Sequence, residues 1–141
     1  MLLALIYAAY TDIKKQEIPI FLFPALMLLY TVIGYNDIIW KNAIFGSVIG
    51  CISFVFLALF FGGGGGDIIM MSCIGFIYGP EILAHIIIVA SVLCILYYLI
   101  KKTNKAPYAP FVLLSYILCF LGGYSYGLNN YRVLEIRYFL L

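Results

Sequence analysis

The stretch AIFGSVIGCISFVFLALFF, at residues 43–61, carries no charged side chain and decides which kind of fold the chain can adopt. A helix that crosses the hydrocarbon core of a bilayer needs about 20 predominantly apolar residues, and this stretch is close to that length. The rest of the chain is similar, because 66% of its residues are hydrophobic and 10% are charged. An ordinary soluble domain has about 45–50% apolar and about 25% charged residues. We therefore predict an integral membrane protein.

Six segments are apolar enough to be interpreted as membrane helices. They cover residues 2–11, 18–34, 43–61, 67–78, 82–100 and 109–126. The first and fourth are short, so each is expected to begin or end at a polar cavity rather than at the far headgroups. The predicted fold class is all-α: a polytopic membrane protein, a bundle of about six transmembrane helices, in a single domain over residues 1–141.

Basic residues in the connections indicate how the bundle is oriented. Because alternate connections lie on the same side of the membrane, five basic residues share one side with the glycine-rich loop and three lie on the other. The first group is Lys14, Lys15, Lys101, Lys102 and Lys105, and the second is Lys41, Arg132 and Arg137. The positive-inside rule places the first group in the cytoplasm.

Charge and cysteine spacing argue against several other classes of protein. A net charge of +2 without a sustained basic run does not favour nucleic acid binding. The four cysteines lie in different apolar stretches and lack the close spacing of a zinc site or a redox pair. We predict no metal and no cofactor.

Two aspartates lie at the predicted cytoplasmic boundary of the bundle. Asp12 follows the first apolar segment and Asp67 opens the fourth. Carboxylates at the edge of the hydrocarbon are costly and commonly mark a functional site. A pair of them suits an aspartic peptidase, in which one ionised carboxylate takes a proton from water while the other, protonated, polarises the scissile carbonyl. Taken alone, Asp12 is equally well interpreted as a charged flank of a membrane helix.

The run of glycines from residue 62 to residue 66 leads directly into Asp67 and contains the pattern G-x-G-D, with Gly64 and Gly66 at its glycine positions. Glycine lets the chain turn tightly and lets a substrate strand approach the backbone beside the carboxylate. The alternative interpretation is a flexible glycine linker that ends in an aspartate N-cap.

Three motifs together resemble the type IV prepilin peptidases. YTDIKKQEIP, at residues 10–19, is similar to their first signature, and GGGD, at residues 64–67, is similar to their second. APYAPF, at residues 106–111, resembles the proline-rich start of their last helix. The motifs occur in the family's order, and the similarity covers residues 2–123. In that family Asn usually follows the proline of the first signature and Lys lies two positions after the second aspartate, whereas this chain has Ile20 and Ile69 there.

The resemblance implies that Asp12 and Asp67 are the catalytic pair, that they face the cytoplasm and that no metal is needed. Gly64, Gly66 and Pro19 are then expected to bind substrate or to shape the loops around it. Glu17 has two interpretations: it helps to receive a basic substrate leader, or it is a solvated loop charge.

The predicted function is that of a membrane-embedded aspartic endopeptidase in the cell membrane of a prokaryote, which serves a type IV pilus or protein secretion. Its expected partners are prepilin-like proteins with a basic leader and a hydrophobic helix, together with membrane lipid. The sequence leaves the oligomeric state open, with a homodimer as one arrangement. Larger family members carry a cytoplasmic insertion and an N-methyltransferase activity, and nothing here corresponds to that region, so we predict a peptidase without methylation.

Three alternatives remain open at this point. One is an intramembrane protease resembling presenilin or signal peptide peptidase, although those chains are much longer. Another is a small transporter or channel subunit, in which Asp12 and Asp67 would bind cations or protons. The third is a catalytically inactive relative that only binds prepilin-like helices.

Overall fold

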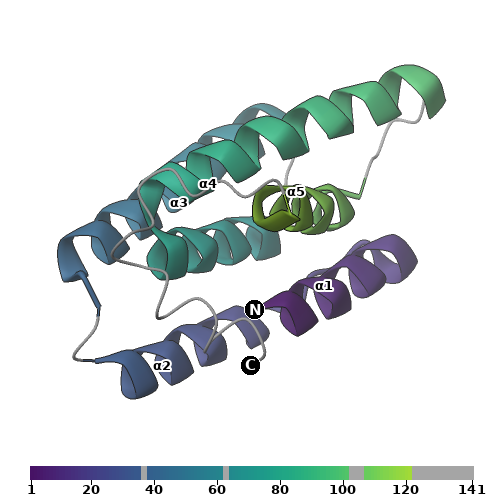
Figure 1. Cartoon of the computed structure of the whole chain (residues 1–141). Helices are drawn as coiled ribbons and strands as arrows, with labels where there is room; N and C mark the ends of the chain where they lie inside the picture. Colours follow the sequence, from purple (N-terminus) through teal and green to yellow (C-terminus); the bar gives the residue numbers. More distant parts are fainter. Residues whose placement is uncertain (36–37, 62–63, 102–106, 122–141) are drawn as a thin grey trace.

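The computed structural model describes residues 1–35, 38–61, 64–101 and 107–121, and within these ranges the chain forms five α-helices and no strand. The helices are α1 (Leu2–Lys15), α2 (Leu22–Gly34), α3 (Trp40–Phe61), α4 (Gly65–Lys101) and α5 (Ala109–Leu121), and Figure 1 shows their arrangement. The prediction of an all-α fold is confirmed for this part of the chain. Several residues used above lie outside it: Gly62, Gly63, Lys102, Lys105, Ala106, residues 122–126, Arg132 and Arg137.

Helix α4 is two helical arms joined at a sharp turn. Gly79 has φ 80° and ψ 176°, a left-handed conformation that glycine adopts readily, and Pro80 follows it without a backbone N–H to continue the helix. A Cβ added to Gly75 would lie 3.0 Å from Cδ2 of Leu83. Eight residues span about 12 Å along a straight helix, so this contact requires the chain to fold back. The two arms lie side by side in Figure 1.

The position of this turn agrees with the predicted boundary between segments 67–78 and 82–100. We call the two parts the first arm (residues 65–78) and the second arm (residues 80–101). Helix α1 differs from its prediction, because it continues past residue 11 to Lys15 and ends at Gln16 with φ 55°. Asp12 therefore lies inside the last turn of α1 rather than after the helix.

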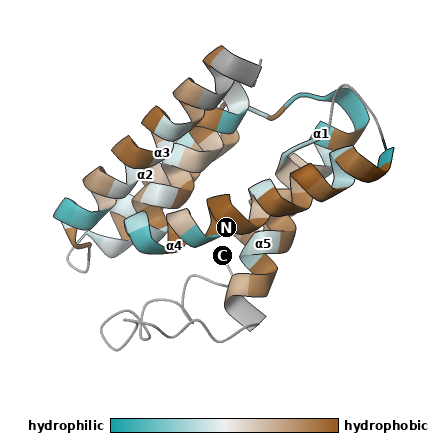
Figure 2. Cartoon of the chain, turned by 90° about the horizontal axis from the view of Figure 1, so that it is seen from above, coloured by the Kyte–Doolittle hydropathy of each residue, from teal (hydrophilic) through white to brown (hydrophobic). Residues whose placement is uncertain are grey.

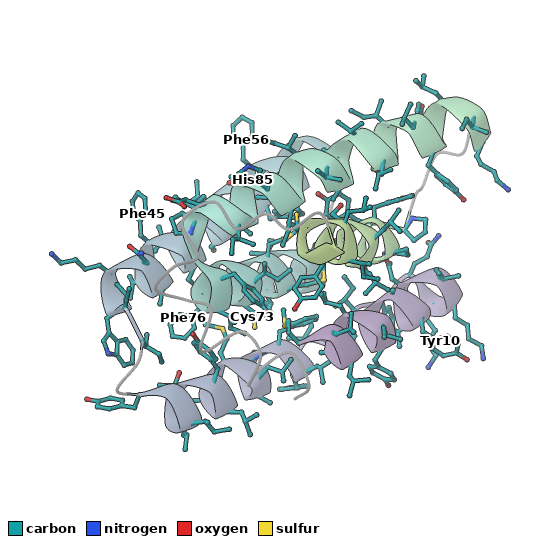
Figure 3. The ribbon with its side chains drawn as sticks, viewed as in Figure 1. Tyr10, Phe45, Phe56, Cys73, Phe76 and His85 are labelled. Atoms are coloured by element: carbon teal, nitrogen blue, oxygen red, sulfur yellow. The ribbon has the colours of Figure 1, made fainter. Side chains whose placement is uncertain are left out.

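Helix α3 packs closely against the first arm of α4. The backbone of Gly46 contacts the backbone of Gly75, and a Cβ added to Gly50 would lie 2.6 Å from the carbonyl oxygen of Met71. Small residues permit such an approach between membrane helices. The first arm also packs on α2, since Cys73 Sγ donates to the carbonyl of Phe23 at 3.4 Å. Figure 3 shows Cys73 and Phe76 pointing toward α2.

The outer surface of the bundle is strongly apolar. Large side chains along the chain are well exposed, among them Phe21 just before α2 at 87%, Val32 of α2 at 80% and Ile100 of α4 at 79%. Figure 2 shows hydrophobic residues along most of the length of the helices. By length and composition, α4 qualifies as a membrane-spanning helix in the part of the chain that the structure describes, whereas α2, the Trp40–Phe56 part of α3, and α5 are apolar but shorter. This single membrane-capable helix is fewer than the six spans predicted.

Candidate active site

Asp12 is held on the buried face of α1. It continues a stripe formed by Leu5 and Ala8, one helical turn apart, and is 7% exposed. Its Oδ2 accepts a hydrogen bond of 2.9 Å from the backbone N–H of Ala109. Ala109 is the first residue of α5, where N–H groups lack a partner within the helix and the helix dipole favours a negative charge. The first and third sequence motifs therefore meet at Asp12.

Asp67 lies in the first turn of α4, and its backbone N–H donates to the carbonyl of Gly64 at 3.1 Å. Its Oδ1 is buried and has no hydrogen-bond partner among the described residues. Gly64 lies beside the same carboxyl group, since a Cβ added there would be 3.7 Å from Oδ2. Buried polar atoms in folded proteins are nearly always paired. The unpaired oxygen is thus available to a water molecule or a substrate group.

The loop after α1 packs directly on the glycine motif. A Cβ added to Gly66 would lie 2.7 Å from Cβ of Ile18 and 3.1 Å from the Ile18 carbonyl oxygen. Only glycine allows this approach without moving the loop. Pro19 follows, and its carbonyl accepts from the N–H of Leu22 at 3.3 Å as α2 begins. The first and second motifs therefore meet between Ile18 and Gly66.

The two aspartates are candidates for a single site. Asp12 comes from the end of α1 and Asp67 from the start of α4, and the charge of Asp12 acts on Asp67. Two carboxylates that interact in this way are more easily accommodated with one proton between them than with both ionised. Such a pair can take a proton from one group and give a proton to another in the same reaction.

The backbone of Gly64 and Gly65 is accessible beside this pair. Both residues are exposed, and a Cβ added to Gly65 would meet nothing within 4 Å. Within the glycine motif, Ile18 therefore occupies the space beside Gly66, whereas the space beside Gly65 is open. Glu17 is also exposed, in the loop that follows α1.

Lys14, in the last turn of α1, contacts Tyr10 one turn earlier. Lys14 Nζ donates to the Tyr10 hydroxyl at 3.1 Å and lies 5.5 Å from the centre of its ring. Tyr10 is 56% exposed and lies on the outer side of α1 in Figure 3. This contact between neighbouring turns holds the Lys14 ammonium on the surface of the helix.

Tyr108 is a further candidate site residue, which sequence reasoning missed. It immediately precedes Ala109, and its ring packs on Phe54 of α3 with the ring centres 5.3 Å apart. Its hydroxyl oxygen is buried and has no hydrogen-bond partner within the described part of the chain. The residue lies inside the APYAPF motif, but nothing in that motif indicates which of its side chains approaches the aspartates.

Comparison with known proteins supports one family. Residues 1–99 match the sequence model of the type IV leader peptidase family, and this range contains both aspartates and the glycine motif. No curated protein matches the chain, and no solved structure matches it. The match covers more than half of the chain. The chain therefore belongs to the type IV leader peptidase family.

Proposed function

We propose that this protein is a membrane-embedded aspartic endopeptidase that removes the leader peptide of prepilin-like proteins, with Asp12 and Asp67 as its catalytic pair. Membership of the family indicates a prepilin-type leader peptidase. The observation that carries the finer proposal is that the contact between Ile18 and Gly66 joins the segments that carry Asp12 and Asp67, and that Oδ1 of Asp67 is buried with no partner among the described residues. The pair lies within a single chain, so the proposed site is complete in one molecule.

The chemistry requires one proton shared between the two carboxyl groups. The ionised group takes a proton from water as the water oxygen bonds to the scissile carbonyl carbon, and the protonated group gives its proton to the carbonyl oxygen. The C–N bond of the resulting diol then breaks as the nitrogen takes a proton from the first group. The second group recovers a proton from the diol oxygen, which leaves a carboxylic acid, an amine and a pair with one proton again.

The membrane arrangement that we propose has six spans, formed by α1, α2, α3, the two arms of α4, and α5. The exposed apolar side chains on the outside of the bundle support it, because lipid tails would cover them. In this arrangement the end of α1 and the start of α4 lie at the cytoplasmic face, close to Lys14 and Lys15. The short α1 and the short first arm both have an end at the site, as expected for helices that border a polar cavity. The whole chain, 1–141, forms one domain in this proposal.

The proposed substrate has a short basic leader followed by a hydrophobic helix. Such a helix would lie in the bilayer beside the enzyme, so that its leader crosses the site at a fixed depth, which lowers the entropic cost of orienting the scissile bond. The exposed backbone at Gly64 and Gly65 supports close approach of an extended strand. Glu17, exposed on the adjacent loop, would attract the basic leader.

Coexpression with candidate prepilins tests this proposal. The native chain is expected to shorten a prepilin by its leader, measured as a loss of mass, and to leave unchanged a prepilin whose leader junction is altered. A native chain that is present in the membrane but cleaves none of a broad panel of prepilins would contradict the proposal, and would favour a relative that only binds these helices. Proton-coupled uptake without cleavage would favour a transporter instead.

A further inference from the structure

Two buried polar atoms at the site lack partners in the part of the chain that the structure describes: Oδ1 of Asp67 and the hydroxyl oxygen of Tyr108. Asp67 opens the first arm of α4, and Tyr108 immediately precedes Ala109, whose backbone N–H donates to Oδ2 of Asp12. Buried polar groups without a partner are rare in native proteins, because each loses its hydration without replacing it. Two of them in one site indicate that a polar molecule completes the site when it works.

Two contacts fix the position of Tyr108, one through the backbone of its neighbour and one through its own ring. Its neighbour Ala109 donates its backbone N–H to Oδ2 of Asp12 at 2.9 Å, which ties the start of α5 to the catalytic pair. Its ring packs against Phe54, which is 5% exposed. With the backbone and the ring both held, the hydroxyl has little freedom to find another partner. Ser91 of α4 is near enough to influence the phenol, but the hydroxyl makes no hydrogen bond of ordinary geometry with a described residue.

The two orphaned groups have complementary chemistry. A carboxylate oxygen accepts hydrogen bonds, and a phenol donates one. Burial is the main cause that raises the pKa of Tyr108 to about 12; the Ser91 hydroxyl lowers this pKa, and Cys94 and Asp67 raise it further, so the hydroxyl keeps its proton. A peptide undergoing hydrolysis supplies the two matching groups, since the attacking water donates and the carbonyl oxygen accepts.

We propose that the Tyr108 hydroxyl is a third catalytic group, which donates a hydrogen bond to the scissile carbonyl oxygen as water attacks the carbonyl carbon beside Asp67. The phenol proton is not transferred, because the carbonyl oxygen takes its proton from the protonated aspartate. As that oxygen gains electron density, the hydrogen bond strengthens, which lowers the energy of the transition state more than that of the bound substrate. This role rests on the proposed peptidase function.

Tyr108→Phe tests the proposal, because it removes only the hydroxyl and keeps the ring on Phe54. Loss of one hydrogen-bond donor to the oxygen of a carbonyl group under attack reduces kcat by about 10²–10³-fold. We expect kcat for a cleaved prepilin to fall by that factor while KM stays unchanged and the pH profile keeps its shape. The melting temperature of the variant in detergent should equal or exceed the native value, because the substitution removes an unpaired buried group.

Two other variants serve as controls. Tyr116→Phe removes a buried hydroxyl that is paired with the Tyr78 hydroxyl at 2.7 Å, away from the proposed site. It should lower the melting temperature and leave kcat unchanged. Ser91→Ala separates a structural role of the Tyr108 hydroxyl from a catalytic one. If Ser91 held this hydroxyl in a structural hydrogen bond, Ser91→Ala and Tyr108→Phe would lower the melting temperature equally.

The outcomes are distinguishable. Native cleavage that is lost in Asp67→Asn but retained within a few-fold in Tyr108→Phe would overturn the role of Tyr108 alone. A lower melting temperature for Tyr108→Phe with unchanged kcat, or an equal fall in kcat for Tyr116→Phe, would also overturn it. Absence of cleavage by the native chain would overturn the peptidase proposal and the role of Tyr108 with it.

Discussion

Substituting Gly66 by alanine should damage the site although it adds a single methyl group. The new Cβ would lie 2.7 Å from Cβ of Ile18 and 3.1 Å from its carbonyl oxygen. Carbon atoms pack at about 3.5–4.0 Å, so the loop would have to move by about 1 Å. The atoms in the way are backbone or directly attached to it, and no rotamer change can remove the overlap.

The expected cost has two parts. Overpacking of this kind destabilises a fold by about 1–3 kcal/mol. A displacement of about 1 Å in an active site can reduce the rate by about 10²-fold. Because Ile18 and Gly66 connect the segments that carry Asp12 and Asp67, the two carboxylates should move relative to one another. We therefore expect Gly66→Ala to lower both the melting temperature and the rate of prepilin cleavage.

Gly65→Ala is the matched control. It adds the same methyl group one residue earlier in the same helix, at a position where nothing lies within 4 Å of the new Cβ. Thermal unfolding in detergent and cleavage of a coexpressed prepilin should be measured for both variants. Native stability for Gly65→Ala together with lower stability for Gly66→Ala would agree with the structure. Equal melting temperatures for the two variants would refute the contact between Ile18 and Gly66.

Two further substitutions test how the site is held. Asp12→Ala should lower the free energy of unfolding by about 1–3 kcal/mol, because it leaves the Ala109 N–H unpaired, whereas Asp12→Asn should keep most of that stability because its amide oxygen can accept the same bond. Chemical denaturation in detergent would show the difference, and equal loss in both variants would contradict it. Gly50→Leu should separate α3 from the first arm of α4, because a Cβ at this position would lie 2.6 Å from the Met71 carbonyl oxygen, and a native melting temperature for this variant would exclude that packing.

Much of the helical framework could be predicted from local sequence. The turn in α4 follows from Gly79 and Pro80, because a glycine that accepts positive φ next to a residue without an N–H ends a helix whatever surrounds it. The end of α1 was harder to predict from the sequence, since its last turn is polar and contains Asp12. In the tertiary structure that turn is helical, and it places Asp12 on the buried face of α1 with Leu5 and Ala8.

The candidate site could be predicted in part. Asp12 and Asp67 stood out because charges are rare in this chain, and the glycine motif marked the second of them. The Asp12–Ala109 hydrogen bond joins residues 97 positions apart, and no local pattern encodes such a distance. Tyr108 could not be predicted as a site residue for a related reason. It is one of 13 tyrosines, and its burial with a hydroxyl that lacks a partner among the described residues is visible in the structure alone.

The central claim is that Asp12 and Asp67 of one chain form the catalytic pair. The most direct measurement is the rate of leader cleavage by purified enzyme in lipid nanodiscs, for the native protein, Asp12→Asn, Asp67→Asn and a mixture of the two variants. We predict cleavage by the native protein alone, with both variants folded and the mixture inactive because neither chain carries a complete pair. Cleavage near the native rate by either single variant would contradict the claim.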